Sequence, residues 1–230
     1  MNINYSICIP KERDVNFMSL CGMVLTTEGI VAFTDSKATK RHWMGHLVED
    51  KDRNPKKLIY NDDIVIVTTG YNQYCKNGEY HLPLEELLEK VITYFSATVN
   101  PEHYTQEQLI KMIYQMLKSP LEESLSLLTE AHYLFLVGLK RVYYSVSAIE
   151  ISKDSQIMYQ KKVKPGENLY FYIGDDTYCK LMADLKIVKR YSIEEIPQFI
   201  KEVVSHMIAI NDLSLDYNPV GGEILTYTFK

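Results

Sequence analysis

The stretch "MSLCGMVLTTEGIVAFTDSKATK", residues 18–40, decides the fold class. It contains two runs of apolar and β-branched residues, 19–26 and 30–34, which flank the dipeptide Glu28-Gly29. Such runs are typical of strands, and a glycine-containing dipeptide between them is typical of a turn. The stretch therefore predicts a hairpin of two strands.

Hydrophobic periodicity divides the rest of the chain into further strands and helices. Apolar residues spaced three and four apart predict helices over 84–95 and 109–117, the second after a capping box from Thr105 to Gln108. Short apolar runs between turn residues predict strands. The further predicted strands are 57–60, 64–69, 133–139, 142–149, 168–173 and 224–229; a short helix follows Asp175, a longer one covers 193–210, and residues 36–56 form a polar loop.

The order of these elements predicts an α+β fold. Strands come first, then two helices, strands, two helices and a final strand. Segregated runs of this kind suggest that helices cover both outer faces of two stacked antiparallel sheets, a four-layer αββα sandwich. A chain of 230 residues commonly folds around one core, so we expect a single domain over residues 1–230. Residues 1–18 are expected to be a leader or an added N-terminal strand.

Composition excludes several classes of function. The net charge is -5 with acidic and basic residues interspersed, which argues against nucleic-acid binding. The four cysteines include no C-x-x-C pair, so neither a disulfide framework nor a cysteine zinc site is expected. His42 and His46 have the spacing of metal-binding pairs on helices, but Gly45 between them disfavours a helix. We expect a cytoplasmic protein with no cofactor, no bound metal and no membrane partner.

Three motifs, in the same order along the chain, resemble proteasome β subunits and their bacterial relatives. In "TTEGIVAFTDSKATK", residues 26–40, a turn glycine leads to an apolar strand and then to Asp-Ser-x-Ala-Thr. In "NPKKLIYNDDIVIVTTGY", residues 54–71, a lysine opens a strand pair that runs to a glycine. "VGGEILTYTF", residues 220–229, contains a Gly-Gly pair before the last strand. The resemblance implies an N-terminal-nucleophile hydrolase with the αββα fold.

This resemblance implies a peptidase or amidohydrolase that activates itself. In such proteins a precursor cuts itself, and the exposed Thr, Ser or Cys attacks an amide with its own α-amine as the base. A serine hydroxyl is a poor nucleophile until a base takes its proton, and an α-amine with a pKa of about 7.7 to 8.0 suits neutral pH. Cleavage at Met18-Ser19 is therefore implied, with a peptide or small amide as substrate and a homo-oligomer, as in the family's rings, as the assembly.

The resemblance also assigns a role to five residues. It implies that Ser19 is the nucleophile and that Lys57 lies beside its oxygen and favours its deprotonated form. It implies that Asp35 holds the Lys57 ammonium and that the Gly70 N–H binds the oxyanion. Asp216 corresponds to the aspartate of a family Asp-x-x-Ser-Gly-Gly run that supports the amine of the nucleophile.

Some positions depart from the family pattern. Met18 and Ser19 stand where the family usually has glycine and threonine, and Val220 replaces the serine of the distal run. Asp216 is one residue farther from the glycines than the family pattern requires, and Asp175 follows a glycine where the family has a serine. These departures support an alternative: a non-catalytic subunit of the same fold that retains its leader as an added strand and acts as an oligomeric scaffold or binding protein.

Two further alternatives concern the nucleophile and the fold. Cys21 lies on the same strand face as Ser19, and a thiol is intrinsically the more reactive group. Unpaired cysteines of this kind are more often small apolar core residues. An unrelated α+β binding module that shares these motifs would lack a pair of stacked sheets.

Overall fold

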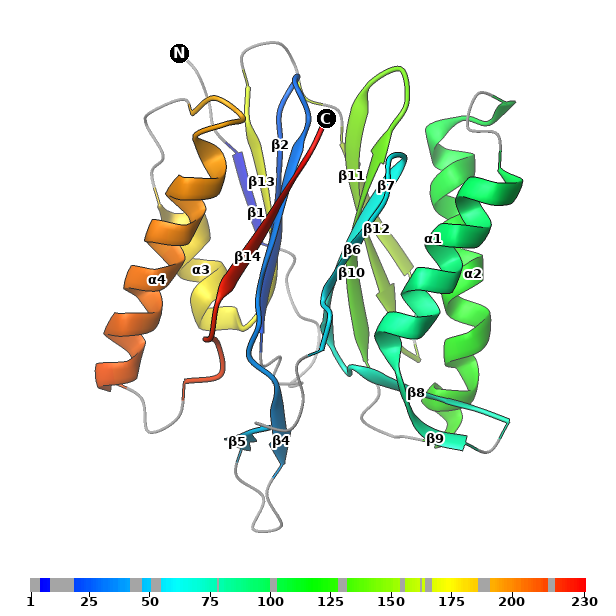
Figure 1. Ribbon diagram of the computed structural model, residues 1–230, viewed down its shortest axis with the longest axis horizontal. Helices are drawn as coiled ribbons and strands as arrows, with labels where there is room; N and C mark the ends of the chain where they lie inside the picture. The colour runs from blue at the N-terminus through cyan, green and yellow to red at the C-terminus, as the bar shows by residue number, and fades with distance from the viewer. Residues whose placement is uncertain are drawn as a thin grey trace.

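Most of the chain is described by a computed structural model. The described residues are 5–8, 19–41, 47–50, 55–77, 79–99, 103–127, 132–153, 156–161, 163, 167–185, 191–214 and 218–230. Within these ranges, four helices flank two five-stranded sheets (Figure 1). The helices are α1 (Leu84–Thr98), α2 (Gln106–Leu127), α3 (Asp176–Asp184) and α4 (Ile196–Ser214).

The first sheet has the strand order β1-β13-β2-β3-β14. Its strands are β1 (Tyr5–Cys8), β2 (Leu20–Leu25), β3 (Ile30–Asp35), β13 (Leu169–Gly174) and β14 (Ile224–Phe229). All neighbours are antiparallel except β1 and β13, which run parallel. The predicted hairpin is thus the centre of this sheet, and an N-terminal strand extends it at one edge.

The second sheet has the order β12-β11-β10-β7-β6 and is antiparallel throughout. Its strands are β6 (Leu58–Tyr60), β7 (Ile64–Gly70), β10 (Tyr133–Lys140), β11 (Tyr144–Ile151) and β12 (Gln156–Lys161). The sheet stacks on the first, and the two helical pairs cover the two outer faces (Figure 1). The predicted αββα sandwich is confirmed.

Some short strands lie outside the sequence prediction. β4 (Thr39–Arg41) pairs with β5 (Leu47–Glu49) inside the segment predicted as a loop, and β8 (Gln73–Lys76) pairs with β9 (Glu79–Pro83) directly before α1. β12 also lacks a strand prediction of its own, whereas β1 falls within residues 1–18, for which an added N-terminal strand was one of two expectations. The unpredicted segments were missed because they are short and mix polar with apolar residues, so they show no clear period of two. The prediction of one long loop over 36–56 was wrong in this respect.

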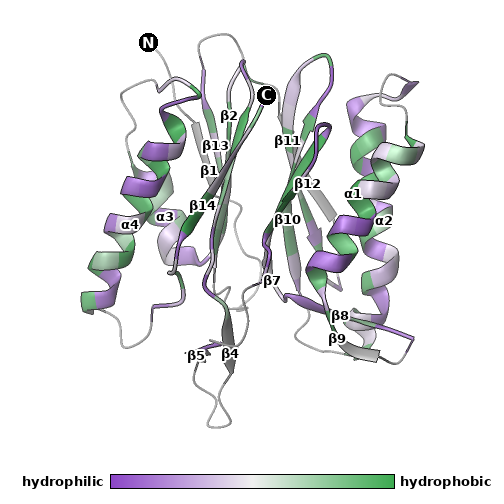
Figure 2. Cartoon of the chain, viewed as in Figure 1, coloured by the Kyte–Doolittle hydropathy of each residue, from purple (hydrophilic) through white to green (hydrophobic). Residues whose placement is uncertain are grey.

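Three apolar layers separate the four structural layers. Along β2, Cys21 and Met23 face the second sheet, whereas Leu20 and Val24 face α3 and α4. This follows from the alternation of side chains along a strand. Because both faces of the hairpin are covered, every residue of β2 and β3 is buried. The helices turn apolar residues to the sheets and polar residues outward (Figure 2).

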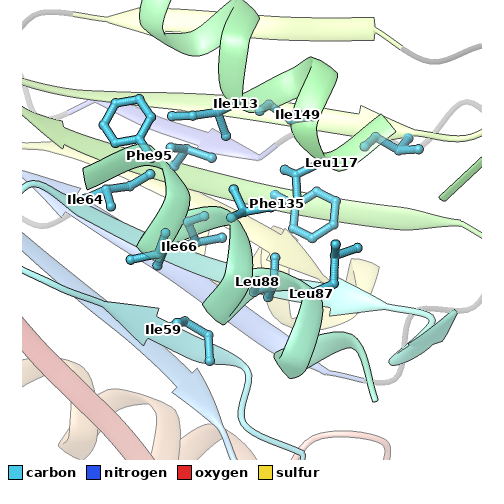
Figure 3. Packing of buried hydrophobic residues seen from close by; sticks show 14 of the residues in the cluster. Ile59, Ile64, Ile66, Leu87, Leu88, Phe95, Ile113, Leu117, Phe135 and Ile149 are labelled. Atoms are coloured by element: carbon cyan, nitrogen blue, oxygen red, sulfur yellow. The ribbon is translucent and has the colours of Figure 1, made fainter. Parts of the chain in front are cut away.

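The third apolar layer joins α1 and α2 to the second sheet. Residues at helical spacing, such as Leu88 and Phe95 of α1 and Leu117 of α2, meet Ile66 and Phe135 from the strands (Figure 3). None of the helices in the described ranges combines the length and the apolar character that crossing a membrane requires.

The predicted helix starts are confirmed at two places. Thr105 and Gln108 form the capping box before α2, since each main-chain N–H binds the side chain of the other residue, at 2.7 Å and 3.3 Å. Asp175 caps α3 by accepting hydrogen bonds from the N–H groups of Thr177 and Tyr178. α2 continues past the predicted end at 117, through Pro120, to Leu127.

Candidate active site

Ser19, Asp35 and Lys57 meet at one end of the sandwich, near the beginning of β2 and the end of β3. Lys57 Nζ lies 2.7 Å from Ser19 Oγ and 3.1 Å from Asp35 Oδ1. The Ser19 hydroxyl donates to the same carboxylate oxygen. All three residues are buried. The structure therefore brings together three of the five residues that the sequence singled out, from segments 16 and 38 residues apart.

The corner between β13 and α3 fixes the backbone of Ser19. Asp175 donates its N–H to the Ser19 carbonyl at 2.8 Å. Gly174 has a φ of 129°, and a Cβ placed there would lie 2.0 Å from the Ser19 carbonyl oxygen. Only glycine adopts this conformation cheaply and leaves room for the approach. The corner thus holds Ser19 where β2 begins.

Lys57 uses all three of its ammonium donors. In addition to the two contacts above, Nζ donates to the backbone carbonyl of Lys37 at 2.6 Å. A lysine ammonium that donates three hydrogen bonds has no lone pair for accepting a proton. It can stabilise a negative Ser19 oxygen, but it cannot be the base in this arrangement.

The Asp35 carboxylate is held on both of its oxygens. Oδ1 accepts from the Leu20 N–H at 3.0 Å in addition to Ser19 and Lys57, and Oδ2 accepts from the Gly221 N–H at 3.3 Å. The side chain is fully buried, with a salt bridge to Lys57. A buried carboxylate needs such partners, because an unpaired buried charge is strongly unfavourable.

Gly70 ends β7 with a φ of 98°, a conformation that favours glycine. The Tyr71 N–H donates to the carbonyl of His132, directly before β10, so the preceding pair in this antiparallel ladder, Gly70 and Tyr133, is not hydrogen-bonded. The Gly70 N–H therefore points away from β10. The Thr68 N–H, two residues earlier and directed the same way, donates to the Lys57 carbonyl. The Gly70 N–H is thus directed toward the Lys57 side of the sheet.

Cys21 lies deeper in the sandwich than Ser19. Its sulfur contacts Thr34 Oγ1 and donates to the Thr68 carbonyl, each at 3.1 Å, and the residue has no exposed surface. Burial raises the pKa of the Cys21 thiol to about 12, so it stays protonated at neutral pH. These properties are those of a core residue.

The other residues singled out by the sequence are distributed as follows. Asp216, Met18, His42 and His46 lie outside the described residues. Val220 is buried in the apolar layer under α3 and α4, where it provides no hydroxyl. Among the residues that the structure describes, no three His, Cys, Asp or Glu side chains are grouped so that they could hold a metal ion.

Sequence reasoning missed three backbone contributors to the site. Lys37 contributes its carbonyl to Lys57, Gly221 contributes its N–H to Asp35, and Leu20 also donates its N–H to Asp35. The Gly221-Gly222 pair was a usable signal for the second, because it was already part of a motif. A backbone carbonyl leaves no signature in the residue type, so nothing in the sequence identified the first.

Comparison with solved structures shows similarity to proteins named Anbu. Anbu (ancestral beta-subunit) from Yersinia bercovieri superimposes with a TM-score of 0.54 and 12% identity, over 91% of this chain and 81% of that one. Anbu from Hyphomicrobium sp. strain MC1 gives 0.52 and 12%, over 92% and 82%, and its Gly-1 mutant gives 0.51 and 14% over the same shares. No protein-family model and no curated protein matches the sequence. At these identities the likeness shows a proteasome-like fold.

Proposed function

We propose that this chain is a proteasome-like N-terminal-nucleophile hydrolase, with Ser19 as nucleophile once residues 1–18 have been removed. The observation that carries the proposal is the position of Ser19 Oγ, which accepts a hydrogen bond from Lys57 Nζ and donates one to Asp35. The cluster includes Ser19, the residue directly before β2. A hydroxyl there becomes chain-terminal after one cut.

The occupied donors of Lys57 explain why the cut is needed. The ammonium cannot accept the hydroxyl proton, and the Asp35 carboxylate is a weak base that already accepts four hydrogen bonds. An amide nitrogen at Ser19 has no available lone pair either. The α-amine that cleavage creates is adjacent to the hydroxyl and has a suitable pKa, about 7.7 to 8.0.

The proposed reaction then has two steps. The α-amine takes the Oγ proton, Oγ attacks the amide carbon, and the oxyanion is stabilised by Lys57 and by the N–H of Gly70. The C–N bond breaks, the leaving amine takes the proton from the α-ammonium, and an ester on Ser19 remains. Water, deprotonated by the same amine, adds to the ester; the bond between the acyl carbon and Oγ breaks, Oγ takes the proton back from the α-ammonium, and the acid is released. Each oxyanion donor of this kind is typically worth about 10² to 10³ in rate.

A second candidate is a non-catalytic subunit that keeps its leader. It is favoured by β1, since residues 5–8 pair with β13 as a strand of the first sheet. The apolar Val220 in place of a supporting serine agrees with it. For both candidates we propose assembly into a homo-oligomer. For the hydrolase we also propose a peptide or small amide as the substrate and Asp216 as a support of the amine.

Covalent labelling tests the first candidate against the second. The purified protein is treated with a peptide β-lactone, which acylates activated hydroxyls, and the adduct is located by peptide mass mapping. We expect the label on Ser19 in the wild type and in Cys21→Ala, none in Ser19→Ala, and labelling retained in Ser19→Thr. Absence of label from Ser19 in a chain that still carries residues 1–18 would favour the scaffold.

A further inference from the structure

Asn218 is a hydrogen-bonding centre in the loop between α4 and β14. It is buried, and its side chain makes four hydrogen bonds. Oδ1 accepts from the Tyr178 hydroxyl at 2.8 Å and from the Val220 N–H at 3.2 Å. Nδ2 donates to the Ile208 carbonyl at 3.2 Å and to Asp212 Oδ1 at 2.9 Å. Every hydrogen-bonding position of one primary amide is thereby occupied.

Two backbone partners fix the orientation of this amide. The Val220 N–H can only donate and the Ile208 carbonyl can only accept, so the oxygen and nitrogen of Asn218 cannot be exchanged. Tyr178 must then be the donor toward Asn218. Burial raises the pKa of Tyr178, which keeps its hydroxyl protonated at neutral pH. Asn218 thus links α3 and α4 to its own loop.

The same loop reaches the candidate active site. Gly221, directly after Val220, donates its N–H to Asp35 Oδ2 and accepts from the Lys37 N–H at 3.1 Å. Lys37 Nζ returns to the Asn218 carbonyl at 2.6 Å. The contacts form a closed ring from Asn218 through Gly221 to Asp35 and Lys37, and back to Asn218.

We propose that Asn218 is a positioning residue for the active site: it fixes the Gly221 N–H and, through it, the rotation of the Asp35 carboxylate. The Gly221 N–H holds Oδ2, whereas the contacts to Ser19 and Lys57 are on Oδ1. A carboxylate rotates as a rigid plane, so holding Oδ2 sets the place of Oδ1. The catalytic part of this inference rests on the proposed function of Ser19.

The expected effect of Asn218→Ala on catalysis follows from this geometry. The loop loses its four side-chain contacts, the Gly221 N–H shifts, and Asp35 Oδ1 moves relative to Ser19 and Lys57. A misplacement of about 1 Å can reduce a rate by about 10². We expect kcat for amide hydrolysis to fall by about 10 to 100-fold with KM unchanged, because Asn218 does not contact the substrate in this scheme.

A double mutant tests whether Asn218 and Lys37 act through one link. Lys37→Met removes the ammonium contact to the Asn218 carbonyl and keeps the Lys37 backbone carbonyl. We expect the combined Asn218→Ala and Lys37→Met change to reduce kcat by much less than the product of the single effects. Effects that multiply would contradict a shared link.

Amide hydrogen exchange tests the inference independently of activity. In Asn218→Ala, the Gly221 amide is expected to exchange at least about tenfold faster than in the wild type. The matched control is Asn168→Ala, which also removes a buried asparagine bonded to a backbone carbonyl, at 3.3 Å to Tyr191. Asn168 lies directly before the first residue of β13, whereas Gly174 is the last residue of that strand. This change should therefore leave Gly221 exchange and kcat unaltered.

The outcomes separate the inference from the proposed function. Unchanged Gly221 exchange in Asn218→Ala overturns the positioning role, whatever the activity. Equal acceleration in Asn168→Ala also overturns it, because a general loss of stability would then suffice. A wild type that never hydrolyses amides, with Gly221 exchange accelerated only by Asn218→Ala, overturns the proposed function and keeps the structural link.

Discussion

Gly174→Ala is expected to displace Ser19 and inactivate the site. The new Cβ would lie 2.0 Å from the Ser19 carbonyl oxygen, and real Cβ atoms almost never approach closer than 3.0 Å, so the two groups must separate by about 1 Å. The φ of 129° adds a strain of about 1 to 3 kcal/mol for any L side chain. Loss of the Asp175 N–H bond to Ser19 adds about 0.5 to 1.5 kcal/mol.

These contributions predict a free energy of unfolding that is lower by about 2 to 4 kcal/mol and a labelling rate of Ser19 that is lower by about 10². Urea titration and the β-lactone reaction measure the two quantities. Gly29→Ala is the control, because its added Cβ would also clash with a backbone oxygen, 2.4 Å from that of Phe229, but at the opposite end of the β2–β3 hairpin from Ser19; it should lower stability and leave the labelling rate unaltered. Gly174→Ala with the wild-type labelling rate and unfolding within about 0.5 kcal/mol of the wild type would refute this reasoning.

Three other substitutions are predicted. Lys57→Met should abolish Ser19 labelling and lower the free energy of unfolding by about 3 to 5 kcal/mol, because the buried Asp35 carboxylate loses its ion-pair partner. The control Lys56→Met removes only a surface ion pair and should change neither quantity. A Lys57→Met chain that is still labelled on Ser19 would contradict the role of the ammonium. Cys21→Ala should keep Ser19 labelling. The buried thiol ionises at a higher pH than in the unfolded chain, so above pH 9 the stability of the wild type should fall relative to Cys21→Ala by up to about 1.4 kcal/mol per pH unit. If urea titrations give both proteins the same dependence of stability on pH, this prediction is wrong. Gln108→Ala should destabilise α2 by about 0.5 to 1 kcal/mol in the same titrations, unlike the control Gln115→Ala on the exposed face.

The sequence was informative where one strong physical preference acts alone. The hairpin around Glu28-Gly29 combines apolar runs with a turn glycine, and the structure has strands at Leu20–Leu25 and Ile30–Asp35. Apolar residues spaced three and four apart predicted α1, and capping residues predicted where α2 and α3 begin. These features depend on local sequence, so they are visible without the rest of the chain.

The sequence did not predict features that depend on backbone groups or on contacts between distant segments. The short strands β4 and β5 have no hydrophobic period, so the sequence does not indicate that they pair. In the site, Ser19, Asp35 and Lys57 could be singled out because the motifs around them resemble those of a known family. The carbonyl of Lys37 and the N–H of Gly221 carry no such signal. Asn218 also escaped notice, because its role comes from four hydrogen-bond partners, three of which lie on α3 and α4.

The N-terminus of the native protein decides whether Ser19 is activated as proposed. Intact mass under denaturing conditions, together with N-terminal sequencing, should show a wild-type chain that begins at Ser19. A native protein that hydrolyses amides or takes the label on Ser19 while residues 1–18 remain covalently attached would contradict it, because no free α-amine would then be present.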